Sequence, residues 1–206
     1  MSATFTQDFL REVSEIARQL DIKAIDRMAQ GLVDLRARNG RLFLLGVGGS
    51  AANASHAAGD FRKLANIEAY CAVDNVTEIT ARTNDQGWEN VFAESLKASR
   101  LTPRDAIMVF SVGGGSIEPS VSANLVHAML YARSVGAGIF AVVGRNGGFA
   151  GQTADHVVLI PTVNTNAITP HTEAFQSVVW HLLVSHPLLA AAAPHWETVE
   201  PMKAAQ

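Results

Sequence analysis

The feature that most constrains the fold is an alternation of short apolar runs with longer segments of helical character. The apolar runs are rich in β-branched residues, as expected of strands buried on both faces, and they fall at about 41–46, 67–73, 105–110, 138–143 and 156–160. Segments between several of these runs are predicted to be helical, notably 51–65, 87–99 and 117–135. Alternating strands and helices predict an α/β fold with a parallel sheet and helices on both of its faces.

The two ends of the chain are predicted to add further helices. Apolar residues recur at three-to-five-residue steps from Phe5 to Leu35, which favours one or two amphipathic helices before Asn39-Gly40. A last helix is expected at about 171–186. We therefore predict an N-terminal helical oligomerisation segment over 1–38, one domain over 39–187 and a tail over 188–206.

Two glycine-serine loops follow the first and third predicted strands, at Gly46-Val47-Gly48-Gly49-Ser50 and at Ser111-Val112-Gly113-Gly114-Gly115-Ser116. The first N–H groups of a helix lack partners, glycines let an anion approach them, and serine hydroxyls add hydrogen bonds. Because the carboxyl ends of parallel strands share one edge of a sheet, we expect both loops to form one anion site there. The run Gly144–Gly148 lies at the same edge, where a simple tight turn would also explain it.

Neither loop matches a nucleotide-binding fingerprint, so no organic cofactor is predicted. The P-loop lysine is absent, and Ala51 stands where a dinucleotide site would place its third glycine. The 206-residue chain has a formal charge of -3 with scattered Lys and Arg, which gives no reason to expect nucleic-acid binding. No signal peptide or membrane span is predicted, and the single cysteine, Cys71, is expected to be a buried small hydrophobe. These features fit a cytoplasmic protein.

Four polar side chains on two predicted helices form a second candidate site. His56 and Asp60 share one helical face at i, i+4, and Glu173 and His181 lie on nearly one face of the last helix. Two histidines and two carboxylates could bind a divalent ion such as zinc, or divide into a general acid and a general base. The alternative is that Asp60 pairs with a neighbouring basic side chain and that the histidines are ordinary, partly buried residues.

Taken together in their order along the chain, these motifs resemble the sugar isomerase (SIS) domain family, and within it the phosphoheptose isomerase branch. The resemblance covers roughly residues 5–187 and rests on the first loop with His56 six residues beyond it, Asn84-Asp85, the loop 111–116, Gly144–Gly148 and Thr153-Ala154-Asp155. It implies a five-stranded parallel sheet of flavodoxin-like type. It also implies a homotetramer built partly through the N-terminal helices, with sites at subunit interfaces.

The resemblance assigns roles to individual residues. The catalytic glutamate of the family falls on Asp60 and its catalytic histidine on His181, and its zinc ligands fall on His56, Asp60, Glu173 and His181. The residues implied to bind the phosphosugar are Gly48, Gly49, Ser50, Asn84, Asp85, Ser111, Gly113, Gly114, Gly115, Ser116 and Glu173.

Several positions depart from the family pattern. Asp60 is one methylene shorter than the usual glutamate, Glu173 replaces a glutamine, and Val47 replaces an asparagine. Val112 and Gly113 stand where a threonine and a serine are usual, which removes two hydroxyls from the phosphate loop. Each lost neutral hydrogen bond costs about 0.5–1.5 kcal/mol, so phosphate binding is expected to weaken without disappearing.

The resemblance predicts a ketose-aldose isomerase that converts sedoheptulose 7-phosphate to D-glycero-D-manno-heptose 7-phosphate. Asp60 is expected to remove the proton beside the carbonyl and His181 to protonate the carbonyl oxygen, through an enediol. The alternative is a non-catalytic binding protein, because the run 50–56 also resembles the branch that associates with the replication initiator DnaA. A phosphosugar-sensing module would use the same loops without proton transfer. Retention of Asp60, Glu173 and His181 together favours the enzyme.

Overall fold

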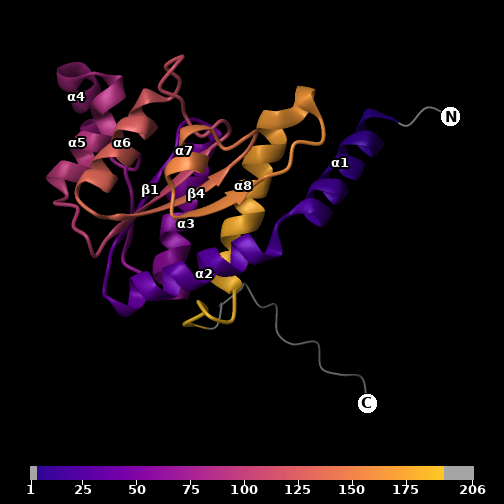
Figure 1. Cartoon of the computed structure of the whole chain (residues 1–206), viewed down its shortest axis with the longest axis horizontal. Coiled ribbons are helices and arrows are strands. Elements are labelled where there is room, and N and C mark those ends of the chain that lie inside the picture. Colours follow the sequence, from indigo (N-terminus) through magenta and orange to yellow (C-terminus); the bar gives the residue numbers. More distant parts are fainter. Residues whose placement is uncertain (1–3, 193–206) are drawn as a thin grey trace.

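The structure is a computed structural model that describes residues 4–192 and places one sheet between two layers of helices (Figure 1). The strands run in the order β2-β1-β3-β4-β5, and every neighbouring pair is parallel. This is the flavodoxin-like order, in which the chain changes direction between β1 and β3 and ligands bind beyond the strand ends. The predicted α/β fold is confirmed by the strands β1 (Leu42–Leu45), β2 (Ala69–Cys71), β3 (Ala106–Ser111), β4 (Gly138–Val143) and β5 (His156–Leu159).

Alternate residues of the central strands enter two separate cores. In β1, Leu42 and Leu44 pack into one core, and Phe43 and Leu45 pack into the other. Every residue of β1 and β3 is buried, which explains why these strands read as continuous apolar runs in the sequence. Cys71, predicted to be a buried small hydrophobe, is buried in the first core, and this burial raises the pKa of its thiol to about 12.

The helices divide between the two faces of the sheet. One face is covered by α2 (Ile22–Ala37), α3 (Gly49–Ala65) and α8 (Ile168–Ser185). The other carries α4 (Val76–Gln86), the 3-10 helix η1 (Trp88–Asn90), α5 (Val91–Ala98), α6 (Ala123–Ser134) and α7 (Gly148–Thr153). Within the described residues, no helix is sufficiently long and apolar to cross a membrane.

The first helix, α1 (Phe5–Gln19), stands outside these layers and runs beside α8 (Figure 1). A capping box between Thr4 and Gln7 fixes its start. Its apolar residues Phe5 and Leu10 are largely exposed, whereas Ile16 is buried in the first core; the role of this helix in oligomerisation stays a prediction. Residues 193–206 of the predicted tail lie outside the described residues.

The predicted helix over 117–135 is wrong in its first part, because α6 begins only at Ala123. Residues 117–122 form an excursion that returns through an antiparallel bridge between Ser116 and Val121. Pro119 has no N–H to donate to a helix, and it disfavours the helical conformation of the residue before it.

Two further helix boundaries differ from the prediction, and one helix was missed. The helix expected over 87–99 begins as a 3-10 turn, and α4 was not predicted at all. The last helix begins three residues early, at Ile168, after the short 3-10 helix η2 (Thr165–Ala167). Pro170 therefore lies in the first helical turn, where a missing N–H costs little.

Candidate functional site

A cavity of about 930 Å³ lies at the carboxyl edge of the sheet, beyond the ends of β1, β3 and β4. The structure brings both glycine-serine loops to its wall, with Ser50 from the first and Ser111, Gly113, Gly115 and Ser116 from the second. The loop after β4 contributes to the same wall. The predicted convergence of the loops at one edge of the sheet is thus observed in the folded chain.

The second loop is held against the first turn of α7. The N–H groups of Phe149 and Ala150 donate to the carbonyl oxygens of Gly115 and Gly114, at 2.8 and 2.9 Å. Gly114 has a φ of +74°, and a Cβ on it would overlap the carbonyl oxygen of Gly147. This position therefore requires glycine for both its backbone conformation and its close packing. The start of α7 is capped by the loop and is not free for a ligand.

Several backbone N–H groups around the cavity remain available. Ser111 Oγ accepts a hydrogen bond from the Gly114 N–H at 3.0 Å, while the N–H groups of Gly113 and Gly115 donate to no group among residues 4–192. Two longer helices also begin here, α3 after Gly48 and α6 after Ser122, and neither has a side-chain cap. Free N–H groups and helix N-termini at one cavity make an environment that favours an anion.

Gly49, the other predicted residue of the first loop, contacts the last helix. A Cβ on Gly49 would overlap the Glu173 carboxylate, so in this arrangement the glycine leaves room for that side chain against the start of α3. Asn53 continues the contact one turn later, where its Nδ2 donates to the Glu173 carbonyl oxygen at 3.0 Å and to Gln176 Oε1 at 3.2 Å. Trp180 Nε1 in turn donates to Asn53 Oδ1 at 3.2 Å. These bonds fix the register of α3 along α8.

This register brings His56, Asp60 and His181 together, with one ligand atom of each lying within 4.8 Å of the others. His56 Nε2 and Asp60 Oδ2 are 3.8 Å apart, and Asp60 forms no ion pair with Arg62 or Lys63 in the described structure. Glu173 is absent from this group because it lies at Gly49, about two helical turns away along α8. Of the four predicted ligands, the fold therefore gathers three.

The hydrogen bond of His181 determines which of its ring nitrogens is free. His181 Nδ1 is 2.8 Å from the carbonyl oxygen of Ser177. A carbonyl oxygen only accepts, so Nδ1 carries the proton and Nε2 keeps its lone pair in the neutral ring. Two imidazoles and one carboxylate with a fourth position open form a common catalytic zinc set, so the donors fit this metal. The His56 side chain is 64% exposed, which leaves the group accessible.

The structure brings Asn84 and Asp85 neither to the cavity nor to the group of His56, Asp60 and His181 within this chain. Both are exposed in the last turn of α4, where Asn84 Nδ2 donates to Asp85 Oδ1 at 2.8 Å. Neither lines the cavity nor belongs to the histidine group, and α4 covers the opposite face of the sheet from α8 (Figure 1).

Some residues of the cavity wall were not among the predicted site residues. They include Ser122, Arg145, Asn146, Gln152 and Thr169. The run Gly144–Gly148 was the available signal for Arg145 and Asn146, because it predicted a turn at the correct edge. No pattern indicated Ser122, since the segment before it was interpreted as helix.

Sequence comparison finds relatives over most of this chain. The model of the SIS domain family matches residues 5–144. Lincomycin biosynthesis protein LmbN of Streptomyces lincolnensis is 34% identical over 194 residues, covering 91% of this chain and 68% of that protein. A phosphoheptose isomerase of Roseiflexus sp. is 33% identical, covering 76% of this chain and 83% of that protein.

Solved structures share the same fold. A phosphoheptose isomerase from Neisseria gonorrhoeae superimposes with a TM-score of 0.73 at 21% identity, covering 88% of this chain and 97% of that one. The Vibrio vulnificus NanR protein, complexed with ManNAc-6P, gives a TM-score of 0.60 at 15% identity over 87% of this chain and 62% of that one. At these identities the likeness concerns the fold alone.

Proposed function

This chain belongs to the SIS domain family, and we propose that it acts as a ketose-aldose isomerase on a heptose 7-phosphate. The predicted family and the predicted isomerase class are confirmed by the family match and by relatives named phosphoheptose isomerase. The sugar and the individual steps belong to the proposal. One observation carries it: two imidazoles and a carboxylate lie about two helical turns along α3 from a cavity with free N–H groups, on helices that pack together.

The separation of these two centres suits a seven-carbon substrate. Along α3, His56 follows the cavity residue Ser50 by six residues, which corresponds to about 9 Å of helix rise. An extended sugar chain from C1 to the phosphorus of a 7-phosphate has about eight bonds, and at about 1.2 Å per bond it reaches about 10 Å. A phosphate bound at the cavity wall beside Ser50 would therefore leave the carbonyl end near the level of His56 along α3. A three-carbon phosphosugar would reach only about half this distance.

Asp60 and His181 supply the groups that proton transfer requires. The Asp60 carboxylate removes the proton from the carbon beside the carbonyl, giving an enediolate, and returns a proton to the neighbouring carbon. His181 holds Nε2 toward the reacting oxygen because Nδ1 is bonded to Ser177. In the imidazolium form it donates a proton to that oxygen, and the ring then takes a proton from the neighbouring hydroxyl as that group becomes the new carbonyl. Zinc bound by His56, Asp60 and His181 would instead supply Lewis-acid polarisation of the carbonyl in place of the His181 proton, because a ligating Nε2 leaves that ring no nitrogen for proton donation. Asp60 would then keep one carboxylate oxygen for the carbon-bound proton.

Assembly into a homotetramer is part of the proposal. On α8, Val178 and Leu182 are 47% and 40% exposed, on the helix that carries His181. Together with the exposed apolar residues of α1 they form a surface that a second subunit would cover. The cytoplasm is the proposed location, and the exposed pair Asn84-Asp85 would join a site only from a neighbouring subunit.

The experiment is an isomerase assay on purified protein with sugar 7- and 6-phosphates. We expect the wild type to interconvert the ketose and aldose heptose 7-phosphates. Asp60→Asn should abolish turnover while preserving the melting temperature, because it removes the proton acceptor but keeps the side-chain size. Asp34→Asn, at an exposed position of α2, is the matched control and should retain activity. Binding of phosphosugars without interconversion would contradict the enzyme and favour a scaffold or a sensor.

A further inference from the structure

Arg145 provides the positive charge of the cavity wall. Among residues 4–192, it is the only Lys or Arg that lines the cavity, and Glu118 is the only acidic residue there. The Arg145 side chain is exposed, and no hydrogen bond or ion pair engages its guanidinium within this part of the chain. A guanidinium without a protein partner, beside unused N–H donors, is available for a ligand.

Arg145 is the second residue of a tight turn closed by the Gly147 N–H and the Gly144 carbonyl oxygen, a place where a positive φ usually falls to glycine, asparagine or aspartate. Arg145 has a φ of +51°, in the left-handed region that non-glycine residues rarely occupy. Among the described non-glycine residues, Asn39, Asn66 and Arg100 have a positive φ at helix C-termini, where a left-handed residue is common. The other two with a positive φ, Ser122 and Arg145, line the cavity. Strain of this kind concentrates at binding sites.

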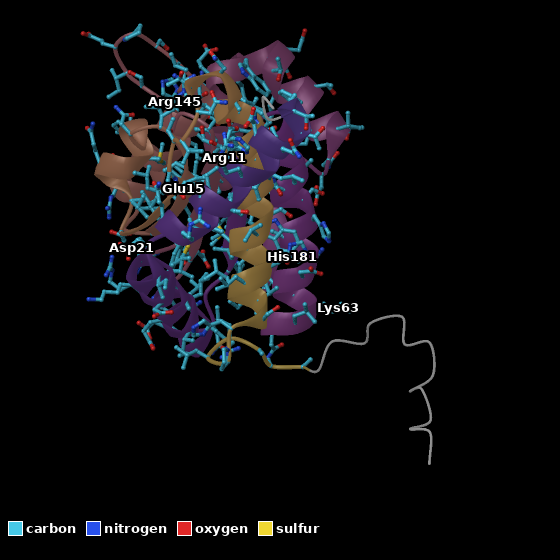
Figure 2. The ribbon with its side chains drawn as sticks, turned by 90° about the vertical axis from the view of Figure 1, so that its right-hand side faces the viewer. Arg11, Glu15, Asp21, Lys63, Arg145 and His181 are labelled. Carbon is cyan, nitrogen blue, oxygen red and sulfur yellow. The ribbon has the colours of Figure 1, made fainter. Side chains whose placement is uncertain are left out.

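Hydrogen bonds hold the Arg145 turn against the second glycine-serine loop. The Gly144 N–H donates to the Val112 carbonyl oxygen at 3.2 Å, and the Gly147 N–H donates to the Gly144 carbonyl oxygen at 2.9 Å. A Cβ on Gly113 would lie 3.9 Å from Arg145 Cδ, so the arginine side chain passes close to Gly113. Figure 2 shows Arg145 near the end of the molecule where α8 begins, whereas His181 lies further along that helix.

We propose that Arg145 binds the phosphate of the substrate, as the charged partner of the N–H groups and hydroxyls of loop 111–116. This inference rests on the proposed function, and it assigns the residue that selects a phosphate end over an uncharged one. A guanidinium presents two parallel N–H donors to phosphate oxygens, which a lysine does not. The left-handed backbone directs the side chain over Gly113.

The test measures the dissociation constants of inorganic phosphate and of a heptose 7-phosphate by calorimetry, together with kcat and KM. We expect Arg145→Ala to weaken both affinities by about ten- to a hundredfold, since it removes a charged hydrogen-bonding partner. Arg145→Lys should recover part of the loss. KM should rise more than kcat falls, because Arg145 lies away from the reacting carbons.

Arg100→Ala is the matched control, since Arg100 is exposed, has the same φ of +51° and does not line the cavity. It should leave phosphate affinity unchanged. Arg145→Gly tests the structural explanation, because glycine relieves the backbone strain while removing the guanidinium. This variant should melt at or above the wild-type temperature and still lose phosphate affinity.

Two outcomes separate this inference from the proposed function. If the wild type binds inorganic phosphate through Arg145 but isomerises no phosphosugar, the proposed function fails and the role of Arg145 stands. If the wild type is an isomerase but Arg145→Ala and Arg145→Gly bind phosphate as tightly as the wild type, the inference is overturned and the function stands.

Discussion

Substitution of Gly114 by alanine is expected to destabilise the loop that forms the anion site. Gly114 has a φ of +74°, which costs an alanine about 1–2 kcal/mol. Its Cβ would overlap the Gly147 carbonyl oxygen and lie 2.6 Å from the carbonyl carbon and 3.2 Å from the Gly148 nitrogen. All three atoms are backbone, so no side chain can turn aside to relieve the overlap. Overpacking of this kind costs about 1–3 kcal/mol.

The sum predicts a loss of about 2–5 kcal/mol from the free energy of unfolding, a large share of the ~5–15 kcal/mol typical of a domain. Relief of the clash would require the Gly114 carbonyl to move away from the Ala150 N–H. The loss would therefore include the contact that caps α7. Urea denaturation monitored by circular dichroism measures this free energy directly.

Gly113→Ala is the matched control at the next position. A Cβ there meets only Arg145 Cδ, at 3.9 Å, and Gly113 has no positive φ. This variant should be neutral or slightly stabilised, because alanine restricts the unfolded chain more than glycine does. Equal effects of the two substitutions, or a loss below about 1 kcal/mol for Gly114→Ala, would refute the reasoning from loop geometry.

Three further predictions follow from the described contacts. Burial acts to raise the pKa of Asp105, but hydrogen bonds from Arg41 and Thr102 outweigh it and hold that pKa at about 2. The folded-state pKa lies below the unfolded value, so about 2 kcal/mol of stability is present above pH ~4 and is lost as the pH falls toward 2. Denaturation at several pH values should show this loss, and Asp105→Asn should flatten it. Elemental analysis should find zinc in the purified protein and less of it in His56→Ala and His181→Ala; an unchanged metal content in both variants would contradict the ligand set. Light scattering should give four times the chain mass of 21.9 kDa, and a monomer at micromolar concentration would contradict the proposed assembly.

The arrangement of the sheet could be predicted because the central strands are buried on both faces. Leu42–Leu45 and Ala106–Ser111 are apolar almost throughout, and such short runs are distinct from the periodic helices between them. The helix α4 was missed because none of its residues is buried, so its sequence carries little apolar periodicity. The start of α6 was misplaced because the bridge between Ser116 and Val121 depends on pairing that local propensity does not encode.

The candidate site was predictable where it follows the sheet edge or one helical face. Ser50 and Ser111 were located by the position of their loops, and His56 and Asp60 by their spacing on one helix. The placement of Glu173 was not predictable from its spacing to His181. It depends on the register between α3 and α8, which the Asn53 hydrogen bonds and the close approach at Gly49 determine.

The central claim is proton transfer by Asp60 on a heptose 7-phosphate, and its most direct test is reaction in deuterium oxide followed by NMR. An enediolate intermediate lets solvent deuterium reach C1 of the ketose and C2 of the aldose. We expect the wild type to interconvert the two sugars with deuterium at these carbons, and Asp60→Asn to do neither while still binding the phosphosugar. A wild-type protein that binds the heptose 7-phosphate but neither interconverts the sugars nor exchanges these protons would contradict the account.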